Sequence, residues 1–320
     1  MKGTHKISVR AKRIRFDFTV RRNITVIRGD SATGKTTLVD MIRQHINNPS
    51  GSPVEVVCDK TCYVLEGALW ESELGAIHDG IVFIDEGNAF VSSRDFAAAI
   101  QNTDNYYVIV TREGLNNLAY STEEIYGIHS AGKYGSLQQT YNEFYRMYGE
   151  DVYTSSLRPD VVITEETNSG YEFFSSVCGR NGTKCESAQG KSNMFRLAQQ
   201  SQGHVLLVAD GAAFGPQMDR IMKLIGENHT VSLYVPESFE WLILKSGLFS
   251  DHRVGTILKN PADYIESSQY LSWERFFTAL LVRESHGTYL EYNKRKLNPN
   301  YLKKNAIERI IAVMDKIDLG

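Results

Sequence analysis

Asn23-Ile-Thr-Val-Ile-Arg-Gly-Asp-Ser-Ala-Thr-Gly-Lys-Thr36 is the stretch that decides the fold of this 320-residue chain. Its opening is rich in β-branched side chains and predicts a buried strand that ends at a glycine. The residues that follow, 35–45, carry Leu38, Met41 and Ile42 in the spacing of one helix face. The sequence therefore predicts a strand, a glycine-containing loop and a helix in direct succession.

The loop matches the phosphate-binding pattern G-x-x-x-x-G-K-[ST] at every required position. Its glycines permit backbone turns that aim N–H groups at a β-phosphate, and the helix adds the positive end of its dipole. Lys35 would place a mobile charge on the β- and γ-phosphates, and the Thr36 hydroxyl would bind Mg²⁺. We predict a site for ATP and Mg²⁺ at Gly29, Asp30, Ser31, Ala32, Thr33, Gly34, Lys35, Thr36 and Thr37.

An acidic pair predicted to belong to the same site ends the run Gly80-Ile-Val-Phe-Ile-Asp-Glu86. Consecutive apolar residues of this kind fit a strand that is covered on both faces. Asp85 would hold the Mg²⁺ shell. Glu86 would polarise the attacking water, which distinguishes a hydrolase from a kinase that must exclude water. The alternative, an acidic pair that simply ends a buried strand, stays open at this point.

A further buried run, residues 106–110, leads to Thr111 and Arg112. Thr111 is predicted to lie near the γ-phosphate, and Arg112 is a candidate for stabilising charge during phosphoryl transfer. An arginine just beyond a strand can equally be a surface or domain-contact residue. ATP is preferred over GTP because the chain has no guanine-reading N-K-x-D motif.

These motifs together resemble the additional-strand, conserved-glutamate (ASCE) class of P-loop ATPases. The resemblance is carried by residues 29–36, Asp85, Glu86 and Thr111, within the N-terminal half of the chain. It implies ATP hydrolysis with Mg²⁺, with Lys35, Glu86, Thr111 and Arg112 as the catalytic residues. The strands before the loop are similar to those of ABC-type ATPases, but no LSGGQ-like signature precedes Asp85, so an ABC-style sandwich dimer is not implied.

Alternating strand and helix patterns predict an α/β fold in two domains, residues 1–155 and 156–320. The first is expected to be a P-loop NTPase domain with a largely parallel sheet, with a hairpin-like pair at 54–58 and 61–65 and an edge hairpin from 124–128 and 134 onward. In the second, strands are predicted at 161–164, 204–209 and 231–235. Its tail, 273–317, is helical in pattern.

Acidic residues follow two predicted strands of the second domain. Glu165 and Glu166 follow one strand, and Asp210 follows another. Carboxylates at adjacent strand ends can share a divalent metal ion, so we predict a possible second metal site at these three residues. The competing interpretation is that strand ends in any α/β domain collect polar residues beside their loops.

This arrangement resembles the Toprim domain of topoisomerases, primases and OLD-family nucleases, in which a strand-end Glu precedes a strand-end D-x-D. The position two after Asp210 is Ala212, so the match lacks one carboxylate. The segments 190–193 and 236–240 look similar to Toprim-like subunits found beside phage-defence ATPases. A Toprim-like second domain with C-terminal helices, acting on nucleic acid in antiviral defence, is what the resemblance implies.

Composition and charge fit a soluble protein. The net charge is −3, no apolar run approaches a membrane span, and the four cysteines form no C-x-x-C pair, so we expect a cytoplasmic protein with no membrane partner. Nine Lys and Arg residues crowd the first thirty positions, which predicts either a phosphate- or nucleic-acid-facing surface or a solvated edge hairpin.

Two functions from different classes remain open. The first is an ATPase whose nucleotide state controls a Toprim-like half that acts on nucleic acid. The second is a nucleotide-switched sensor or homo-oligomeric assembly protein whose C-terminal half binds a protein partner without chemistry, which Ala212 favours. A kinase is a third possibility, and Glu86 argues against it.

Overall fold

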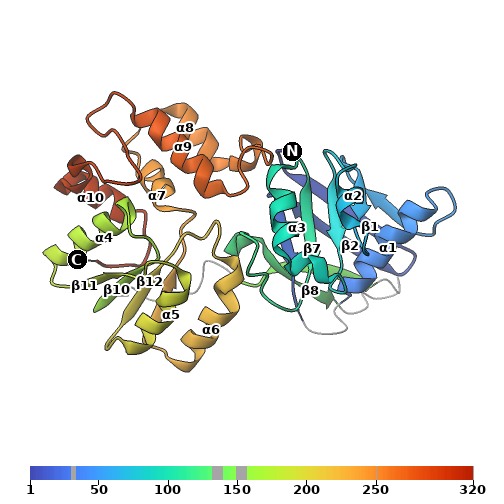
Figure 1. Ribbon diagram of the computed structural model, residues 1–320, viewed down its shortest axis with the longest axis horizontal. Helices are drawn as coiled ribbons and strands as arrows, with labels where there is room; N and C mark the ends of the chain where they lie inside the picture. Colours follow the sequence, from blue (N-terminus) through green and yellow to red (C-terminus); the bar gives the residue numbers. More distant parts are fainter. Residues whose placement is uncertain (30–33, 132–139, 149–156, 250, 320) are drawn as a thin grey trace. The chain divides into compact units, whose positions relative to one another are not determined.

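The computed structural model describes residues 1–320 except 30–33, 132–139, 149–156, 250 and 320. The chain divides into two compact units (Figure 1): unit 1 is Met1–Tyr148 with Asn260–Leu271, and unit 2 is Gly149–Lys259 with Ser272–Gly320. The boundary predicted at residue 155 lies outside the described residues. Segment Asn260–Leu271, which the sequence places in the second domain, groups with unit 1.

Unit 1 contains a nine-stranded, mostly parallel sheet in the order β4-β1-β2-β9-β8-β3-β7-β6-β5. Parallel pairs join β2 to β9 and connect β8, β3, β7, β6 and β5 in turn, while β4-β1, β1-β2 and β9-β8 are antiparallel. The strands are β1 (His5–Ala11), β2 (Ile14–Val20), β3 (Ile24–Ile27), β4 (Glu55–Val57), β5 (Cys62–Val64), β6 (Ile81–Ile84), β7 (Tyr106–Val110), β8 (Ile125–Ala131) and β9 (Thr140–Arg146). The predicted α/β class with a largely parallel sheet is confirmed.

Two strand pairings differ from the sequence prediction. The strands predicted as a hairpin-like pair, β4 and β5, lie at opposite edges of the sheet, because β4 pairs with β1 and β5 pairs with β6. An isolated pair of such short strands is marginally stable, and each gains more by extending a larger sheet. The predicted edge hairpin, β8 with β9, is antiparallel as expected but lies inside the sheet, between β3 and β2.

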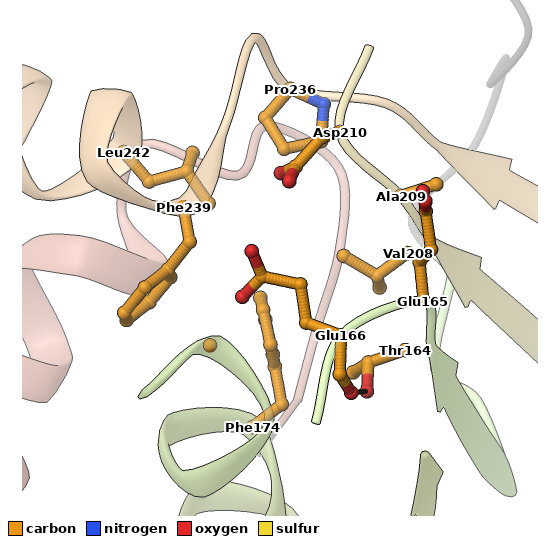
Figure 2. A pocket seen from close by; sticks show the side chains of 11 residues that line it. Thr164, Glu165, Glu166, Phe174, Val208, Ala209, Asp210, Pro236, Phe239 and Leu242 are labelled. Carbon is orange, nitrogen blue, oxygen red and sulfur yellow. Dashed lines mark hydrogen bonds between the residues drawn. The ribbon is translucent and has the colours of Figure 1, made fainter. Parts of the chain in front are cut away.

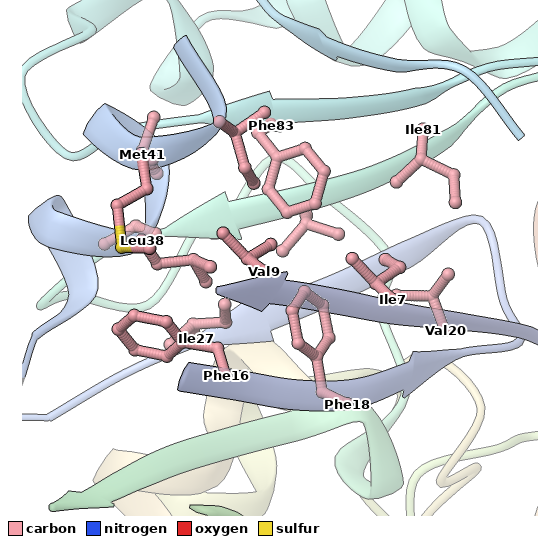
Figure 3. Packing of buried hydrophobic residues seen from close by; sticks show 14 of the residues in the cluster. Ile7, Val9, Phe16, Phe18, Val20, Ile27, Leu38, Met41, Ile81 and Phe83 are labelled. Atoms are coloured by element: carbon pink, nitrogen blue, oxygen red, sulfur yellow. The ribbon is translucent and has the colours of Figure 1, made fainter. Parts of the chain in front are cut away.

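Helix α1 (Lys35–Asn47) covers the core of unit 1. Figure 3 shows Leu38 and Met41 of this helix packed close to Phe83 and Val9 of the sheet, with Phe16 beside them. All five side chains are buried. The apolar spacing read from the sequence therefore marks the face of α1 that lies on the sheet. The remaining helices of unit 1 are α2 (Trp70–Leu74) and α3 (Arg94–Ala99), with short 3₁₀ turns at Ala89–Ser92, Ile100–Asn102, Thr122–Glu124 and Pro261–Asp263.

Unit 2 contains a four-stranded parallel sheet in the order β11-β10-β12-β13. Its strands are β10 (Val161–Thr164), β11 (Lys184–Ser187), β12 (Val205–Val208) and β13 (Val231–Tyr234). Helix α4 (Ser169–Arg180) lies on one face of the sheet, and α5 (Lys191–Gln200) and α6 (Met218–Glu227) lie on the other (Figure 1). Right-handed crossovers in this strand order require that division, because the chain steps one way from β10 to β11 and the other way afterwards.

The C-terminal part of unit 2 is less continuous than its pattern predicts. Helices α9 (Trp273–Ser285) and α10 (Lys304–Ile311) form within the predicted helical tail, but between them only Pro299–Leu302 is helical, as a 3₁₀ turn. Helices α7 (Phe239–Lys245) and α8 (His252–Lys259) and strand β11 were not predicted. Their short spans hold too few residues for a period to stand out.

Phe16 gives a test of the unit 1 core. The ring is fully buried and its edge lies 3.6 Å from where a Cβ on Gly34 would be. Phe16→Ala should lower the free energy of unfolding by about 3–5 kcal/mol, because the cavity forms beneath α1. Hydrogen exchange of peptides from β3 and β7 measures this loss of stability in unit 1 alone, and their protection should fall in Phe16→Ala. Leu69→Ala, whose side chain is 70% exposed, is the control, and equal protection in both variants would contradict the packing.

Candidate functional site

The carboxyl ends of β3, β7 and β6 lie next to one another in unit 1. Strand β7 pairs with β3 on one side and with β6 on the other, both in parallel. Ile27 is registered with Val110, and the Thr111 N–H donates to the Ile27 carbonyl at 3.1 Å. The buried strands therefore deliver Gly29, Thr111 and Asp85 to one edge of the sheet.

The described residues of the predicted phosphate-binding loop have the backbone that the motif requires. Gly29 and Gly34 both have positive φ angles, of 138° and 87°, in the region that favours glycine. Lys35 is buried, and its ammonium group donates to the Gly29 carbonyl at 2.8 Å. Thr36 and Thr37, in the first turn of α1, are exposed. The predicted ligands Asp30, Ser31, Ala32 and Thr33 lie outside the described residues.

Glu86 and Arg112 form a bidentate ion pair across the ends of β6 and β7. Arginine Nε lies 2.9 Å from Glu86 Oε2, and Nη2 lies 2.7 Å from Oε1. The hydrogen bond from Arg112 lowers the pKa of the Glu86 carboxyl, and the charge of Lys35 contributes in the same direction. Asp85 sits beside this pair, and its carboxylate accepts the Glu86 N–H at 2.9 Å. Arg112 thus neutralises the carboxylate that was predicted to polarise water.

The basic N-terminal strands carry partners for much of their charge. Arg10 pairs with Glu55 at 2.8 Å, and Arg15 pairs with Asp17 at 2.6 Å. Arg21 binds the buried carboxylate of Glu124 at 2.7 Å. These ion pairs leave a smaller positive surface than the sequence count of nine basic residues indicates.

In unit 2 the register of the sheet brings Glu166 and Asp210 together. Thr164 of β10 is registered with Val208 of β12, and the two acids each follow two residues later. Carboxylate oxygens of Glu166 and Asp210 lie within 4.8 Å of each other. The Glu165 carboxylate instead lies 4.0 Å from the Lys191 ammonium group. Of the predicted acids, Glu166 and Asp210 share one site and Glu165 borders it.

A small pocket surrounds these acids, and Figure 2 shows Glu166 and Asp210 pointing into it. Two glycines make the arrangement possible. A Cβ on Gly170, at the start of α4, would lie 2.5 Å from Glu166 Oε2, and a Cβ on Gly211 would lie 2.6 Å from the Val235 carbonyl. The pocket is lined by Thr164, Glu165, Glu166, Gly170, Phe174, Val208, Ala209, Asp210, Pro236, Phe239 and Leu242.

Three further charged residues complete an acidic cluster that the sequence did not predict in full. Glu274 comes from the first turn of α9, Glu240 from the first turn of α7, and Lys294 from the segment that follows α9. The Lys294 ammonium group lies 2.5 Å from Glu274, 3.3 Å from Glu166 and 3.3 Å from Glu240. We call Glu166, Asp210, Glu240 and Glu274 the acidic cluster.

Burial and mutual repulsion govern the protonation of the cluster. Burial raises the pKa of Asp210 well above its ordinary value, and the charges of Glu166, Glu274 and Glu240 add to the effect. Burial also raises the pKa of Glu166. Burial opposes the charge on Lys294, but Glu240 and Glu274 raise its pKa so that it stays protonated. Burial therefore favours the neutral form of the Glu166 and Asp210 carboxyls more than it is favoured in an exposed acid, because both pKa values are raised.

The cluster has the donors and spacing for one divalent ion. Carboxylate oxygens of Glu166, Asp210 and Glu274 lie within 4.8 Å of one another. Two oxygens bound at about 2.0–2.6 Å to one ion are at most about 5 Å apart, so the spacing suits a single Mg²⁺ or Mn²⁺. Glu240 Oε2 is buried without a hydrogen-bond partner, in a side chain only 1% exposed. The Ala212 position is buried and supplies no ligand.

Comparisons with known proteins add no relatives: no family model, curated protein or solved structure matches the chain. Across the described part of the chain, no helix is both long and apolar enough to cross a membrane.

Asp210 allows a test of this electrostatic description in metal-free protein. Above about pH 4 the unfolded state loses the Asp210 proton while the folded state keeps it, so stability falls as pH rises toward the elevated folded pKa. Asp210→Asn removes that loss and should raise the free energy of unfolding at pH 8 by on the order of 1 kcal/mol. The gain should vanish near pH 3.

Thermal unfolding in EDTA at pH 3 and pH 8 measures this difference. Asp219→Asn, which changes an acid in the first turn of α6, is the matched control and should show no such pH-dependent gain. An Asp210→Asn protein that is less stable than wild type at pH 8 would contradict the account.

Proposed function

We propose that unit 1 binds and hydrolyses ATP with Mg²⁺, and that its nucleotide state controls metal-dependent phosphodiester chemistry on nucleic acid in unit 2. The observation that carries the ATPase half is the strand order β3-β7-β6. Strand β7 lies between the strand that leads to the loop and the strand that leads to Asp85 and Glu86, which is the position that the ASCE resemblance expects for an additional strand. This order supports a single site made from all three motifs.

The side chains of unit 1 have distinct roles in this proposal. Lys35 leaves the Gly29 carbonyl to bind the β- and γ-phosphates, and Thr36 and Asp85 bind Mg²⁺. The bidentate pair of Arg112 with Glu86 keeps the glutamate from acting as a base. A γ-phosphate offers the guanidinium an equally good bidentate partner, so Arg112 moves to the phosphate and Glu86 is released to polarise water beside Thr111.

ATPase assays on three variants test this half. Lys35→Ala should lose nucleotide binding, and Glu86→Gln should bind ATP as wild type does but lose at least about 10²-fold in kcat, the usual scale of general-base loss. Glu71→Gln, an exposed acid in α2, is the control and should match wild type. Phosphate release that survives Glu86→Gln would exclude Glu86 as the base, and transfer of phosphate to another acceptor would favour a kinase.

The control of unit 2 by nucleotide is supported by chain connectivity. The Ser267 carbonyl, in segment Asn260–Leu271, accepts a hydrogen bond at 3.1 Å from the side chain of Asn23, which directly precedes β3. Seven positions further along the chain is Glu274, in the acidic cluster of unit 2. A shift of β3 on nucleotide binding can therefore pull on the start of α9 through a short stretch of backbone.

The chemistry proposed for unit 2 rests on the acidic cluster. A divalent ion held by Glu166, Asp210 and Glu274 would polarise a phosphodiester oxygen and lower the pKa of bound water. Gly170 and Gly211 hold the first two carboxylates in place by leaving room for close packing. Glu274 restores the third carboxylate that Ala212 removes from the D-x-D pattern, so the deficit seen in the sequence does not exclude a working site.

A second candidate function is a nucleotide-switched assembly protein whose unit 2 binds a protein partner. The buried Ala212 and the placement of Lys294 among the acids favour it, because both reduce the need for a metal. Oligomerisation that depends on ATP in a protein without nuclease activity would support this candidate over the first.

The nuclease function and the assembly function predict different effects of Glu274→Gln on nucleic-acid cleavage. If unit 2 is a nuclease, wild type with Mn²⁺ should cleave single- or double-stranded DNA or RNA, and both Glu274→Gln and Asp210→Asn should lose at least about 10²-fold in rate, in keeping with lost metal binding. Glu284→Gln, at the other end of α9, is the control. Absence of cleavage of every substrate by wild type, with and without ATP, would remove the nuclease function.

A further inference from the structure

Lys294 occupies an unusual position, because its ammonium group contacts three acids from three different elements. It binds Glu274 of α9, Glu240 of α7 and Glu166 beyond β10 at 2.5 to 3.3 Å. Two of these, Glu166 and Glu274, are also the acids whose oxygens could hold a metal with Asp210. The ammonium group and a divalent ion would therefore compete for the same two carboxyl groups.

The charge in the acidic cluster shows why a cation is needed there. Four carboxyls face one ammonium group. The Glu240 side chain is 1% exposed, and its Oε1 is bound by the Tyr292 hydroxyl at 2.8 Å and by Lys294, while Oε2 has no hydrogen-bond partner. A buried carboxylate with one unpaired oxygen is costly, so Glu240 depends on the Lys294 charge beside its Oε1.

Lys294 is also free to leave. Its side chain is 30% exposed, whereas Glu240 is almost fully buried, so the lysine can swing to solvent while the acids stay in place. The four-carbon stem of lysine carries a compact charge that moves easily, unlike the planar fork of arginine. Lys294 is thus the most exposed member of this group of ion pairs.

We infer that Lys294 acts as a built-in cation that holds the acidic cluster together when no metal is bound, and that one divalent ion displaces it. The inference rests on the proposed metal-dependent function of unit 2 and specifies its regulation. Because the ammonium group must be displaced, the metal affinity of the wild type is reduced, and only one ion is accommodated by Glu166, Asp210 and Glu274.

Calorimetric titration of chelator-treated full-length protein with MnCl₂, without nucleotide, tests the inference. Lys294→Met should bind one Mn²⁺ about tenfold or more tightly than wild type, since the competing ion pairs are gone. Lys294→Arg keeps the charge and should not gain affinity. Lys223→Met removes the same charge from an exposed site on α6 that pairs with Glu227, and should match wild type. Asp210→Asn should bind none at this site.

A second measurement uses the wild-type chain, so that the test survives if Lys294→Met fails to fold. Trace acetylation with acetic anhydride, read by mass spectrometry, should modify Lys294 several-fold faster in saturating Mn²⁺ than in EDTA, while Lys223 is unchanged. Displacement frees the amine from its contacts with Glu166, Glu240 and Glu274 and so opens it to the reagent.

The outcomes distinguish failure of the metal site from failure of the role given to Lys294. If neither wild type nor Lys294→Met binds Mn²⁺, the metal-dependent function of unit 2 fails together with the inference. If wild type binds one Mn²⁺ but Lys294→Met binds no tighter, or if Lys294 acetylation does not rise, the metal site stands and the role of Lys294 is overturned.

Discussion

Parallel pairing of fully buried strands is the constraint on which both sites depend. Such strands end at the same edge of their sheet, so the residues that follow them meet in space however far apart they lie in the chain. In unit 1 this brings Gly29, Thr111 and Asp85 together, and in unit 2 it brings Glu166 to Asp210. The helices that cover the sheets, such as α1 over Phe83, exclude water from the strands and hold their register.

Strand pairing sets the approximate positions of the site residues, and glycines that allow close packing adjust them further. A Cβ on Gly34 would lie 3.6 Å from the Phe16 ring, and a Cβ on Gly170 or Gly211 would lie under 3 Å from a neighbouring atom. The two sites nevertheless differ in how their charge is held. In unit 1 a single exposed arginine, Arg112, neutralises Glu86, whereas in unit 2 the buried Glu240 and the half-buried Glu166 and Glu274 share one lysine. Each of these carboxylate groups is therefore paired with a cation from the chain itself.

The sequence predicted the parts of each site that follow directly from a strand. The loop, Asp85 with Glu86, and Glu166 with Asp210 all lie where strand ends were expected, because four or five consecutive apolar residues mark a buried strand without knowledge of its neighbours. The pairing partners of the strands were less predictable. Strands β4 and β5 each extend one edge of the large sheet, and no local sequence pattern specifies the edge at which a short strand pairs. Glu274 and Lys294 could not be found, because a polar residue at the start of a helix or in an irregular segment looks like any exposed charge until the fold brings it inward.

The proposal that nucleotide in unit 1 controls chemistry in unit 2 requires a divalent cation in unit 2. The location of that cation is therefore the most direct test. Anomalous diffraction at the manganese edge, from crystals of the full-length protein grown in MnCl₂, would show it. The account predicts one peak in unit 2, within about 2.0–2.6 Å of oxygens from Glu166, Asp210 and Glu274, with the Lys294 ammonium group turned away. No peak among these carboxylates at saturating Mn²⁺, with Lys294 still bound to Glu166 and Glu274, would contradict it.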